Sequence, residues 1–202
     1  MDVIFATHNK NKLKELKELL SGGAYRVYSL SEAGFTDEID ETGDTIEENA
    51  MIKAKAVADF CKGRPDDFAV LADDTGLFVD ALNGEPGVYS ARYSGENATY
   101  ESNNEKLLKN MKDVPDDRRT ACFRTAVACV CRNGDTFIVN GECKGVILRE
   151  NRGDNGFGYD PLFWCIALKK TFAEATAEEK NGVSHRGAAM RKAAELLKKA
   201  TL

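Results

Sequence analysis

Apolar positions recur along the chain with two different periods, one typical of helices and one typical of strands. Helical spacing predicts four helices, at residues 10–20, 45–61, 99–111 and 184–199. Apolar or β-branched runs predict strands at residues 2–7, 25–30, 120–131 and 136–148. A further apolar stretch, residues 68–82, contains Asp-Asp-Thr-Gly, and we predict a strand, a sharp turn and a second strand there.

Local stop and start signals support these elements. Thr45 and Glu48 have the spacing of a capping box at the start of the second helix, and Gly63 with Pro65 predicts its end. The first helix is predicted to end at Ser21-Gly22-Gly23. Asn133-Gly134-Asp135 between two β-type runs predicts a hairpin.

Helices and strands are mixed along the chain, and the long hairpin interrupts a strict β-α-β alternation. This order indicates an α/β or α+β fold with a mixed sheet. The sequence shows no internal repeat and no linker, so residues 1–202 are predicted to form one domain. We expect the hairpin half to build a second lobe.

Composition narrows the function classes. The formal net charge is −5 and the sequence pI is near 5.2, which argues against broad electrostatic binding to nucleic acid or an anionic membrane. The first apolar run is too short for a secretory signal, so we expect a cytoplasmic protein. The six cysteines form no CxxC pair and have no histidines at metal-binding spacing, and we interpret them as reduced, mostly buried thiols.

The stretch FATHNKNKLKEL places Lys10, Lys12 and Lys14 where the first helix begins. Acidic side chains are favoured at this positive end of the helix dipole, and basic ones are not. Either the helix tolerates a small penalty, or an anion normally binds there. The last helix repeats the anomaly, because His185 and Arg186 follow the predicted N-cap Ser184. The chain has only two histidines, His8 and His185, and each lies at one of these two helix starts.

Paired carboxylates suggest a metal site. Asp73 and Asp74 follow an apolar run, and adjacent strand residues can meet one ligand only if the strand ends there. The alternative is that Asp74 only initiates an Asx turn. The acidic loop DEIDETG supplies further carboxylates and includes Glu41; such a loop is often merely solvated, but carboxylate oxygens are also what Mg²⁺ selects.

The stretch NGFGYDPLF brackets Phe157 with Gly156 and Gly158. Glycines beside an aromatic ring allow close approach to a flat ligand, although an ordinary aromatic turn would have the same composition. The Walker, GxGxxG and GxSxG patterns are absent from the sequence. A nucleotide would therefore be bound by a different arrangement.

With these motifs together, the chain resembles the inosine/xanthosine triphosphate pyrophosphatases, which remove noncanonical purine nucleotides. Five blocks carry the resemblance nearly end to end: FATHNKNKLKEL, ETGDTIEENAMIKAKA, LADDTGLFVDALNGEPGVYSARYSG, FGYDPLF and AEEKNGVSHRGAAMRKA. It implies an elongated mixed sheet, two α/β lobes with a nucleotide cleft between them, a homodimer, and Mg²⁺-dependent hydrolysis of ITP, dITP and XTP to the monophosphate and pyrophosphate.

The resemblance also implies roles for individual residues. Glu41 and Asp74 would be metal ligands, and Asp74 would also accept a proton, with Asp73 as an auxiliary acid. Glu48 is a capping residue first and a ligand second. The positions implied for substrate binding are Thr7, His8, Asn9, Lys10, Asn11, Lys12, Lys53, Thr75, Phe157, Gly158, Tyr159, Asp160, Lys180, His185 and Arg186. His8 departs from the glycine usual in the family, which would cost strain if the turn needs a positive φ.

The leading hypothesis is attack by water on the α-phosphorus with pyrophosphate leaving. Donors at His185 and Arg186 would read the purine 6-oxo group, which ATP lacks. One rival is a related pyrophosphatase acting on dUTP or other modified nucleotides. Another is a nucleotide-binding module without turnover, which the paired aspartates and the ETG carboxylate disfavour.

Overall fold

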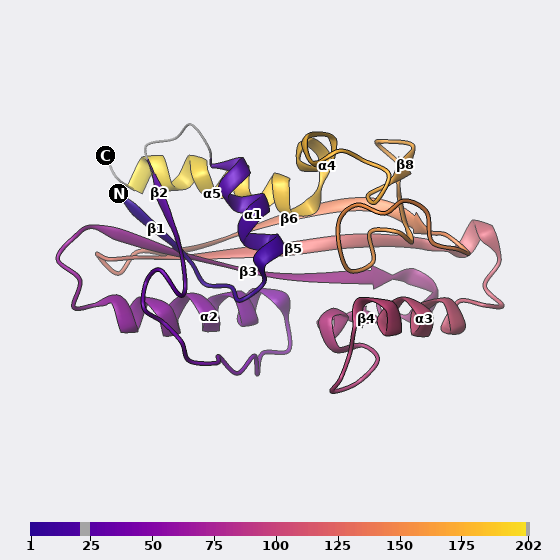
Figure 1. The fold of residues 1–202 in the computed structure, drawn as a ribbon, viewed down its shortest axis with the longest axis horizontal. Coiled ribbons are helices and arrows are strands. Elements are labelled where there is room, and N and C mark those ends of the chain that lie inside the picture. Colours follow the sequence, from indigo (N-terminus) through magenta and orange to yellow (C-terminus); the bar gives the residue numbers. More distant parts are fainter. Residues whose placement is uncertain (21–24, 201–202) are drawn as a thin grey trace. The chain divides into compact units, whose positions relative to one another are not determined.

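The structure is a computed structural model that describes residues 1–20 and 25–200. The helices are α1 (Lys10–Leu19), α2 (Ile46–Cys61), α3 (Tyr100–Asn110), α4 (Ala177–Val183) and α5 (His185–Ala200). The strands are β1 (Asp2–Phe5), β2 (Arg26–Ser29), β3 (Phe68–Val79), β4 (Pro86–Gly87), β5 (Thr120–Cys131), β6 (Thr136–Ile147), β7 (Phe163–Cys165) and β8 (Lys170–Thr171). Figure 1 shows their arrangement. The predicted end of the first helix at Ser21-Gly22-Gly23 lies outside the described residues.

Hydrogen-bonded strands follow the order β2-β1-β3-β5-β6-β7-β8, and β4 pairs with β3. Strand β1 runs parallel to β2 and to β3, whereas β7 runs antiparallel to β6 and to β8. The sheet is therefore mixed, and the predicted mixed α/β class is confirmed. The predicted hairpin is also present, since β5 and β6 are neighbours and the Cys131 N–H donates to the Asp135 carbonyl at 2.8 Å.

The prediction of a turn within residues 68–82 was wrong, because β3 continues through Asp73, Asp74, Thr75 and Gly76. Gly76 is required for a different reason: a Cβ there would lie 2.5 Å from the carbonyl oxygen of Gly87 on the paired strand β4. The glycine thus allows two backbones to approach closely and does not bend the chain.

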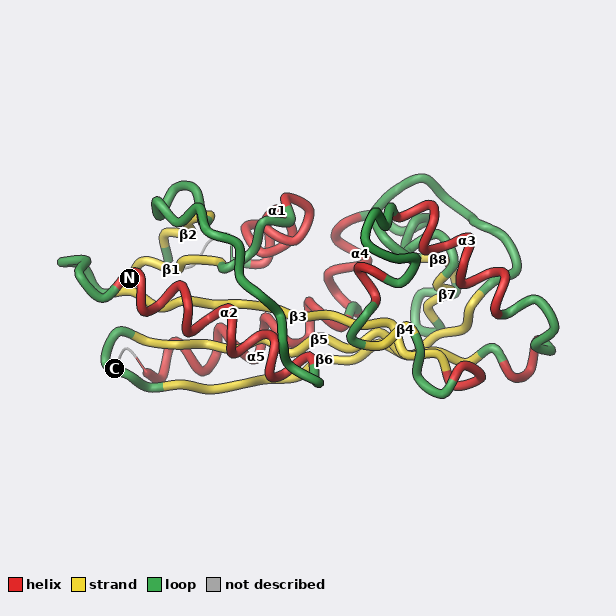
Figure 2. The backbone as a smooth tube through the Cα atoms, turned by 90° about the horizontal axis from the view of Figure 1, so that it is seen from below, coloured by secondary structure: helices red, strands yellow, loops and turns green. Residues whose placement is uncertain are grey.

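The chain divides into two compact units. Unit 1 contains residues 1–74, 125–140 and 189–202, and unit 2 contains residues 75–124 and 141–188. In unit 1, α2 lies on one face of the strands and α1 with α5 on the other (Figure 1). The end of this sheet, with β2, β1 and β3 in order, is seen from below in Figure 2.

Each unit has its own apolar core. In unit 1, Leu16 of α1 and Met190 of α5 pack on Val3, Phe5 and strand residues beside them. The core of unit 2 is rich in aromatic side chains. Those that are fully or almost fully buried include Phe123, Tyr159, Phe163 and Phe172. Burial of side chains of this size supplies the main favourable contribution to folding.

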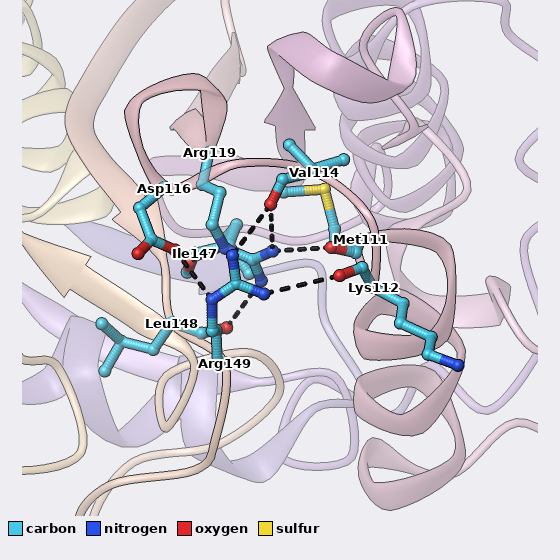
Figure 3. Close-up of polar contacts among 8 residues, drawn as sticks. All are labelled: Met111, Lys112, Val114, Asp116, Arg119, Ile147, Leu148 and Arg149. Carbon is cyan, nitrogen blue, oxygen red and sulfur yellow. Dashed lines mark hydrogen bonds and ion pairs between the residues drawn. The ribbon is translucent and has the colours of Figure 1, made fainter.

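A buried arginine of unit 2 forms hydrogen bonds with two segments that are distant in the sequence. Arg119 is 3% exposed, and its guanidinium donates to four carbonyl oxygens, those of Met111, Val114, Ile147 and Leu148 (Figure 3). The neighbouring Arg149 is half exposed and donates to Asp116 and to the carbonyls of Lys112 and Val114. Arg119 therefore supplies a charged donor to four backbone carbonyls, two of which, those of Met111 and Val114, also accept from the Val114 N–H and from Arg149.

Within the described residues, no helix combines the length and apolarity needed to cross a membrane. All six cysteines have free thiols, and most are buried, as predicted.

Candidate functional site

The predicted site residues form two sets, one in each unit. Unit 1 holds Thr7, His8, Asn9, Lys10, Asn11, Lys12, Glu41, Lys53, Asp73 and Asp74. Unit 2 holds Thr75, Phe157, Gly158, Tyr159, Asp160, Lys180, His185 and Arg186.

The start of α1 is capped by a neutral side chain. Asn9 Oδ1 accepts from the backbone N–H groups of Asn11 and Lys12 at 2.9 and 3.3 Å, and Thr7 Oγ1 accepts from the Asn9 N–H at 3.1 Å. The first turn of α1 contains no acidic residue. The positive end of the helix is therefore not neutralised by a carboxylate of its own first turn.

His8 fits this turn without left-handed backbone. Among the described residues other than glycine, only Asn83 and Lys169 have a positive φ. The strain considered for a histidine at this position is thus not present, and its Nε2 lies 3.3 Å from the Asp37 carbonyl oxygen. Lys10 and Lys14 are exposed on α1, whereas Lys12 is partly buried.

The two adjacent aspartates contact different lysines. Lys12 Nζ lies 3.1 Å from Asp73 Oδ2, whereas Lys53 Nζ lies 3.5 Å from Asp74 Oδ1. Lys53 also lies 3.2 Å from Glu41 Oε1. Because β3 is continuous, neighbouring side chains point to opposite faces, and α1 and α2 supply one lysine to each face.

Asp74 has the electrostatics expected of a proton acceptor. Burial raises its pKa above the ordinary value, and the nearby charges of Glu41 and Asp73 act in the same direction. Lys53 and Lys12 lower it and so oppose the effect of burial. A carboxylate whose pKa is raised toward neutrality is a better base than an ordinary aspartate.

The same carboxylates suit a hard divalent cation. Glu41 and Asp74 already place one oxygen each within 3.5 Å of a single positive atom, Lys53 Nζ. No group of three His, Cys, Asp or Glu side chains with metal-site geometry occurs within residues 1–20 and 25–200. This donor set fits Mg²⁺, which commonly binds one or two carboxylates and takes its other ligands from water and substrate phosphates.

Glu48 belongs to the helix cap, as predicted. Its Oε2 accepts from the backbone N–H groups of Asp44 and Thr45, and the Thr45 hydroxyl accepts from the Glu48 N–H. The capping box is therefore complete, and both roles of Glu48 in it are structural.

In unit 2, a buried ion pair contacts the backbone of the turn that carries Phe157. Lys180 Nζ lies 2.6 Å from Asp160 Oδ2, and that same oxygen accepts from the Phe157 N–H at 2.9 Å. Lys180 Nζ also lies 4.8 Å from the centre of the Phe157 ring, and the Arg186 guanidinium lies 5.6 Å from it. Cations at these distances favour the electron-rich face of the ring.

His185 and Arg186 begin α5 and are almost fully buried, at 3% and 2% exposure. The His185 ring stacks on Phe123, with centroids 4.6 Å apart and an angle of 15°. Arg186 Nη2 donates to the Thr75 hydroxyl at 3.2 Å. Ser184 caps this helix as predicted, since its hydroxyl accepts from the Gly187 N–H.

Tyr159 lies in the core of unit 2 and is 5% exposed. Its hydroxyl donates to the Ser90 carbonyl at 2.9 Å, and burial raises its pKa. The structure therefore gives this side chain a place in the core of unit 2, and its contact with substrate stays a prediction.

Three of the residues that contact predicted site residues were not predicted from the sequence. Phe123 stacks on His185, Tyr100 contacts the Phe157 ring, and Asn104 donates to the Gly158 carbonyl. Each is separated from its partner by more than fifty positions, so no local pattern connects them. The resemblance to the family did not single them out either.

Known proteins with similar sequences are nucleotide hydrolases by name. A profile of the Ham1 family matches residues 3–196. The dITP/XTP pyrophosphatase of a Thermoanaerobacter strain is 52% identical over 192 residues, which are 95% of this chain and 94% of that protein. The dITP/XTP pyrophosphatase of Bacillus subtilis is 48% identical over 196 residues, covering 97% and 96% of the two chains.

Solved structures agree with the sequence comparison. The Ham1 protein of Staphylococcus aureus matches with a TM-score of 0.86 and 37% identity, over 99% of this chain and all of that one. The nucleoside-triphosphatase/dITP/XTP pyrophosphatase of Mycobacterium abscessus matches with a TM-score of 0.75 and 43% identity, over 98% and 99% of the chains. The resemblance inferred from the sequence is confirmed, and the chain belongs to the Ham1 family.

Proposed function

We propose that the protein hydrolyses noncanonical purine nucleoside triphosphates (ITP, dITP and XTP) to the monophosphate and pyrophosphate. The observation that carries the proposal is the placement of Lys53 between the carboxylates of Glu41 and Asp74, at 3.2 and 3.5 Å. Such a group offers both a cation for phosphate oxygens and oxygens for a metal. Membership of a family whose curated relatives are named dITP/XTP pyrophosphatases supports the same reaction.

The triphosphate would bind at the start of α1. Lys10 and Lys12, with Lys53 of α2, would neutralise its negative charge, and the positive end of the helix dipole would add to their attraction for phosphate oxygens. Glu41 and Asp74 would hold Mg²⁺, which when bound polarises the phosphates and compensates developing charge. Asp73, which forms an ion pair with Lys12, would orient that lysine.

In the chemical step, a water oxygen forms a bond to the α-phosphorus while the bond from that phosphorus to the bridging oxygen breaks. Pyrophosphate carries away the electron pair of the broken bond. Asp74 would accept the proton of the attacking water, a role that its raised pKa favours.

The purine would be recognised by residues of unit 2. Phe157 would stack on the base, and His185 and Arg186 would donate hydrogen bonds toward the 6-oxo group. ATP presents a 6-amino donor where these side chains would donate, and a mismatch of this kind can cost about 10⁴-fold or more in specificity. Asp160 and Lys180 would support the Phe157 turn through their 2.6 Å contact.

A nucleotide panel tests the proposal. Pyrophosphate release should be fastest with dITP, ITP or XTP, slow with ATP and dUTP, and abolished by chelation of divalent metal. GTP shares the 6-oxo group and shows whether position 2 of the purine is read as well. Fast turnover of dUTP alone would support the rival pyrimidine activity, and tight ITP binding without pyrophosphate release would support a binding module.

We further propose that the enzyme works in the cytoplasm as a homodimer with Mg²⁺ as its metal. The six free thiols are compatible with a reducing compartment. Sedimentation of the purified protein measures its oligomeric state.

A further inference from the structure

The turn that carries Phe157 has an unusual backbone. Gly156 and Gly158 both have positive φ, at 77° and 66°. A Cβ on Gly156 would collide with the carboxylate of Asp160, which accepts a hydrogen bond from the Phe157 N–H. The turn therefore wraps around this carboxylate, and the Asp160–Lys180 pair fixes one side of it.

Helix α3 contacts the turn from elsewhere in unit 2. Asn104 is 6% exposed, and its Nδ2 donates to the Gly158 carbonyl at 3.1 Å. Tyr100 precedes Asn104 by one helical turn, so both side chains lie on the same face of α3. The Tyr100 ring lies 6.0 Å from the Phe157 ring, centre to centre, at an angle of 43°.

The space between α3 and the turn is not filled by side chains. A cavity of about 400 Å³ is lined there by Tyr100 and Asn104 on one side and by residues of the turn, including Phe157, on the other. An aromatic ring beside such a space has fewer neighbours to hold it than a ring in a close-packed core. The contacts from Tyr100 and Asn104 therefore restrain the turn on this side.

We propose that Tyr100 and Asn104 are positioning residues that hold the Phe157 ring in place for stacking on the purine. The inference rests on the proposed function, because it requires Phe157 to meet the base. Asn104 fixes the backbone after Phe157, and Tyr100 limits the swing of the ring toward the cavity. Neither residue needs to touch the phosphates, which the lysines of unit 1 would bind.

Because Tyr100 and Asn104 would affect only the binding of the base, the inference can be tested by comparing a ligand that has a base with one that has only phosphates. The KM and kcat for dITP are measured beside the inhibition constant of inorganic tripolyphosphate, which has phosphates but no base. Tyr100→Ala and Asn104→Ala should raise the KM for dITP by about 5- to 20-fold, because part of a base–aromatic stack is lost. Their kcat and their tripolyphosphate inhibition constant should stay within about twofold of wild type, and Tyr100→Phe should restore the wild-type KM.

Tyr89→Ala is the matched control, because Tyr89 is also an exposed tyrosine of unit 2, at 61% against 41% for Tyr100. It should leave the KM for dITP unchanged. Tyr100 is exposed, so its variants test the inference even if Asn104→Ala does not fold. The inference is overturned if Tyr100→Ala leaves the KM for dITP unchanged, or if it raises the inhibition constant of tripolyphosphate as much as this KM. Turnover of dITP by the wild-type protein would still support the proposed function in either case. A wild type that releases no pyrophosphate from any nucleotide overturns both.

Discussion

Replacing Lys53 by methionine removes a buried ammonium and keeps most of its apolar stem. The lysine side chain is 11% exposed and lies 3.2 Å from Glu41 and 3.5 Å from Asp74. In the variant the two carboxylates remain together without their cation. We therefore expect opposite effects on folding and on metal binding.

The loss of stability follows from the burial of the partners. Removing one member of a fully buried ion pair costs about 3–5 kcal/mol. Glu41 is one-third exposed, at 33%, so water screens part of the repulsion, and we expect about 2–3 kcal/mol at neutral pH. For a protein of this size that corresponds to a decrease in Tm of roughly 5–10 °C.

The pH dependence has a definite sign. Lys53 lowers the pKa of Asp74, so its removal raises this folded-state pKa further above the unfolded value. A carboxyl with a raised folded-state pKa destabilises the protein above that pKa and is relieved as protonation proceeds below it. The difference in Tm between Lys53→Met and wild type should therefore shrink as the pH is lowered from 7 toward 5.

Metal binding should change in the other direction. An ammonium within 3.5 Å of both ligand oxygens repels a divalent cation, so its loss should tighten Mg²⁺ binding by the nucleotide-free protein. Thermal melts in EDTA and over a Mg²⁺ series measure both effects, and Lys55→Met on the exposed face of α2 is the control. The reasoning fails if Lys53→Met melts like wild type in EDTA, or if Mg²⁺ stabilises both proteins equally.

Four further substitutions, in two pairs, separate the roles of neighbouring groups. Asp74→Asn should fold normally and lose about 10²-fold or more in kcat, because it removes a base that accepts the water proton; near-normal pyrophosphate release would contradict this. Asp73→Asn should mainly raise the KM, by about 10-fold, because it frees Lys12 from its 3.1 Å partner; a kcat loss as large as that of Asp74→Asn would refute the distinction. Arg119→Met should lower the free energy of unfolding by about 3–5 kcal/mol without changing the KM, because four carbonyls lose a buried charged donor. Arg149 is half exposed, so Arg149→Met should cost less than about 1.5 kcal/mol in a urea titration, and equal losses would refute the burial argument.

Local chemistry explains which elements could be predicted. The capping box of Thr45 and Glu48 and the Asn133-Gly134-Asp135 hairpin are determined by neighbouring residues, and both occur in the structure. Helix α4 was missed although it carries a similar signal, since Thr176 and Glu179 form a capping box before a helix of seven residues. Strands β7 and β8 have three and two residues and exist only through pairing with other strands, which no local pattern records.

The error at Asp73-Asp74 has a tertiary cause. Gly76 was interpreted as a turn signal, but its missing side chain accommodates the backbone of β4. With the strand continuous, the two aspartates separate to Lys12 and Lys53 instead of converging on one ligand. The family resemblance predicts Glu41 as a metal ligand and Asp74 as a base, and both roles stay predictions, whereas the pairing of each carboxylate with a lysine required the fold.

The α-helices within residues 1–20 and 25–200 differ in their first turns, and this difference supports the hypothesis of an anion at α1. Helices α2, α3 and α4 each have an acidic residue in the first turn and a complete capping box. Helices α1 and α5 have no acidic residue in the first turn, and both begin with cationic or imidazole side chains among the predicted site residues. A cation at the positive end of a helix is unfavourable by about 0.3–1 kcal/mol. The sequence follows the dipole preference at α2, α3 and α4, where no ligand is proposed. It departs from this preference at α1 and α5, the two helices that would bind the nucleotide. A triphosphate at α1 and a purine oxygen at α5 would reverse the sign of that local interaction, which is the reason such side chains are suited to these two positions.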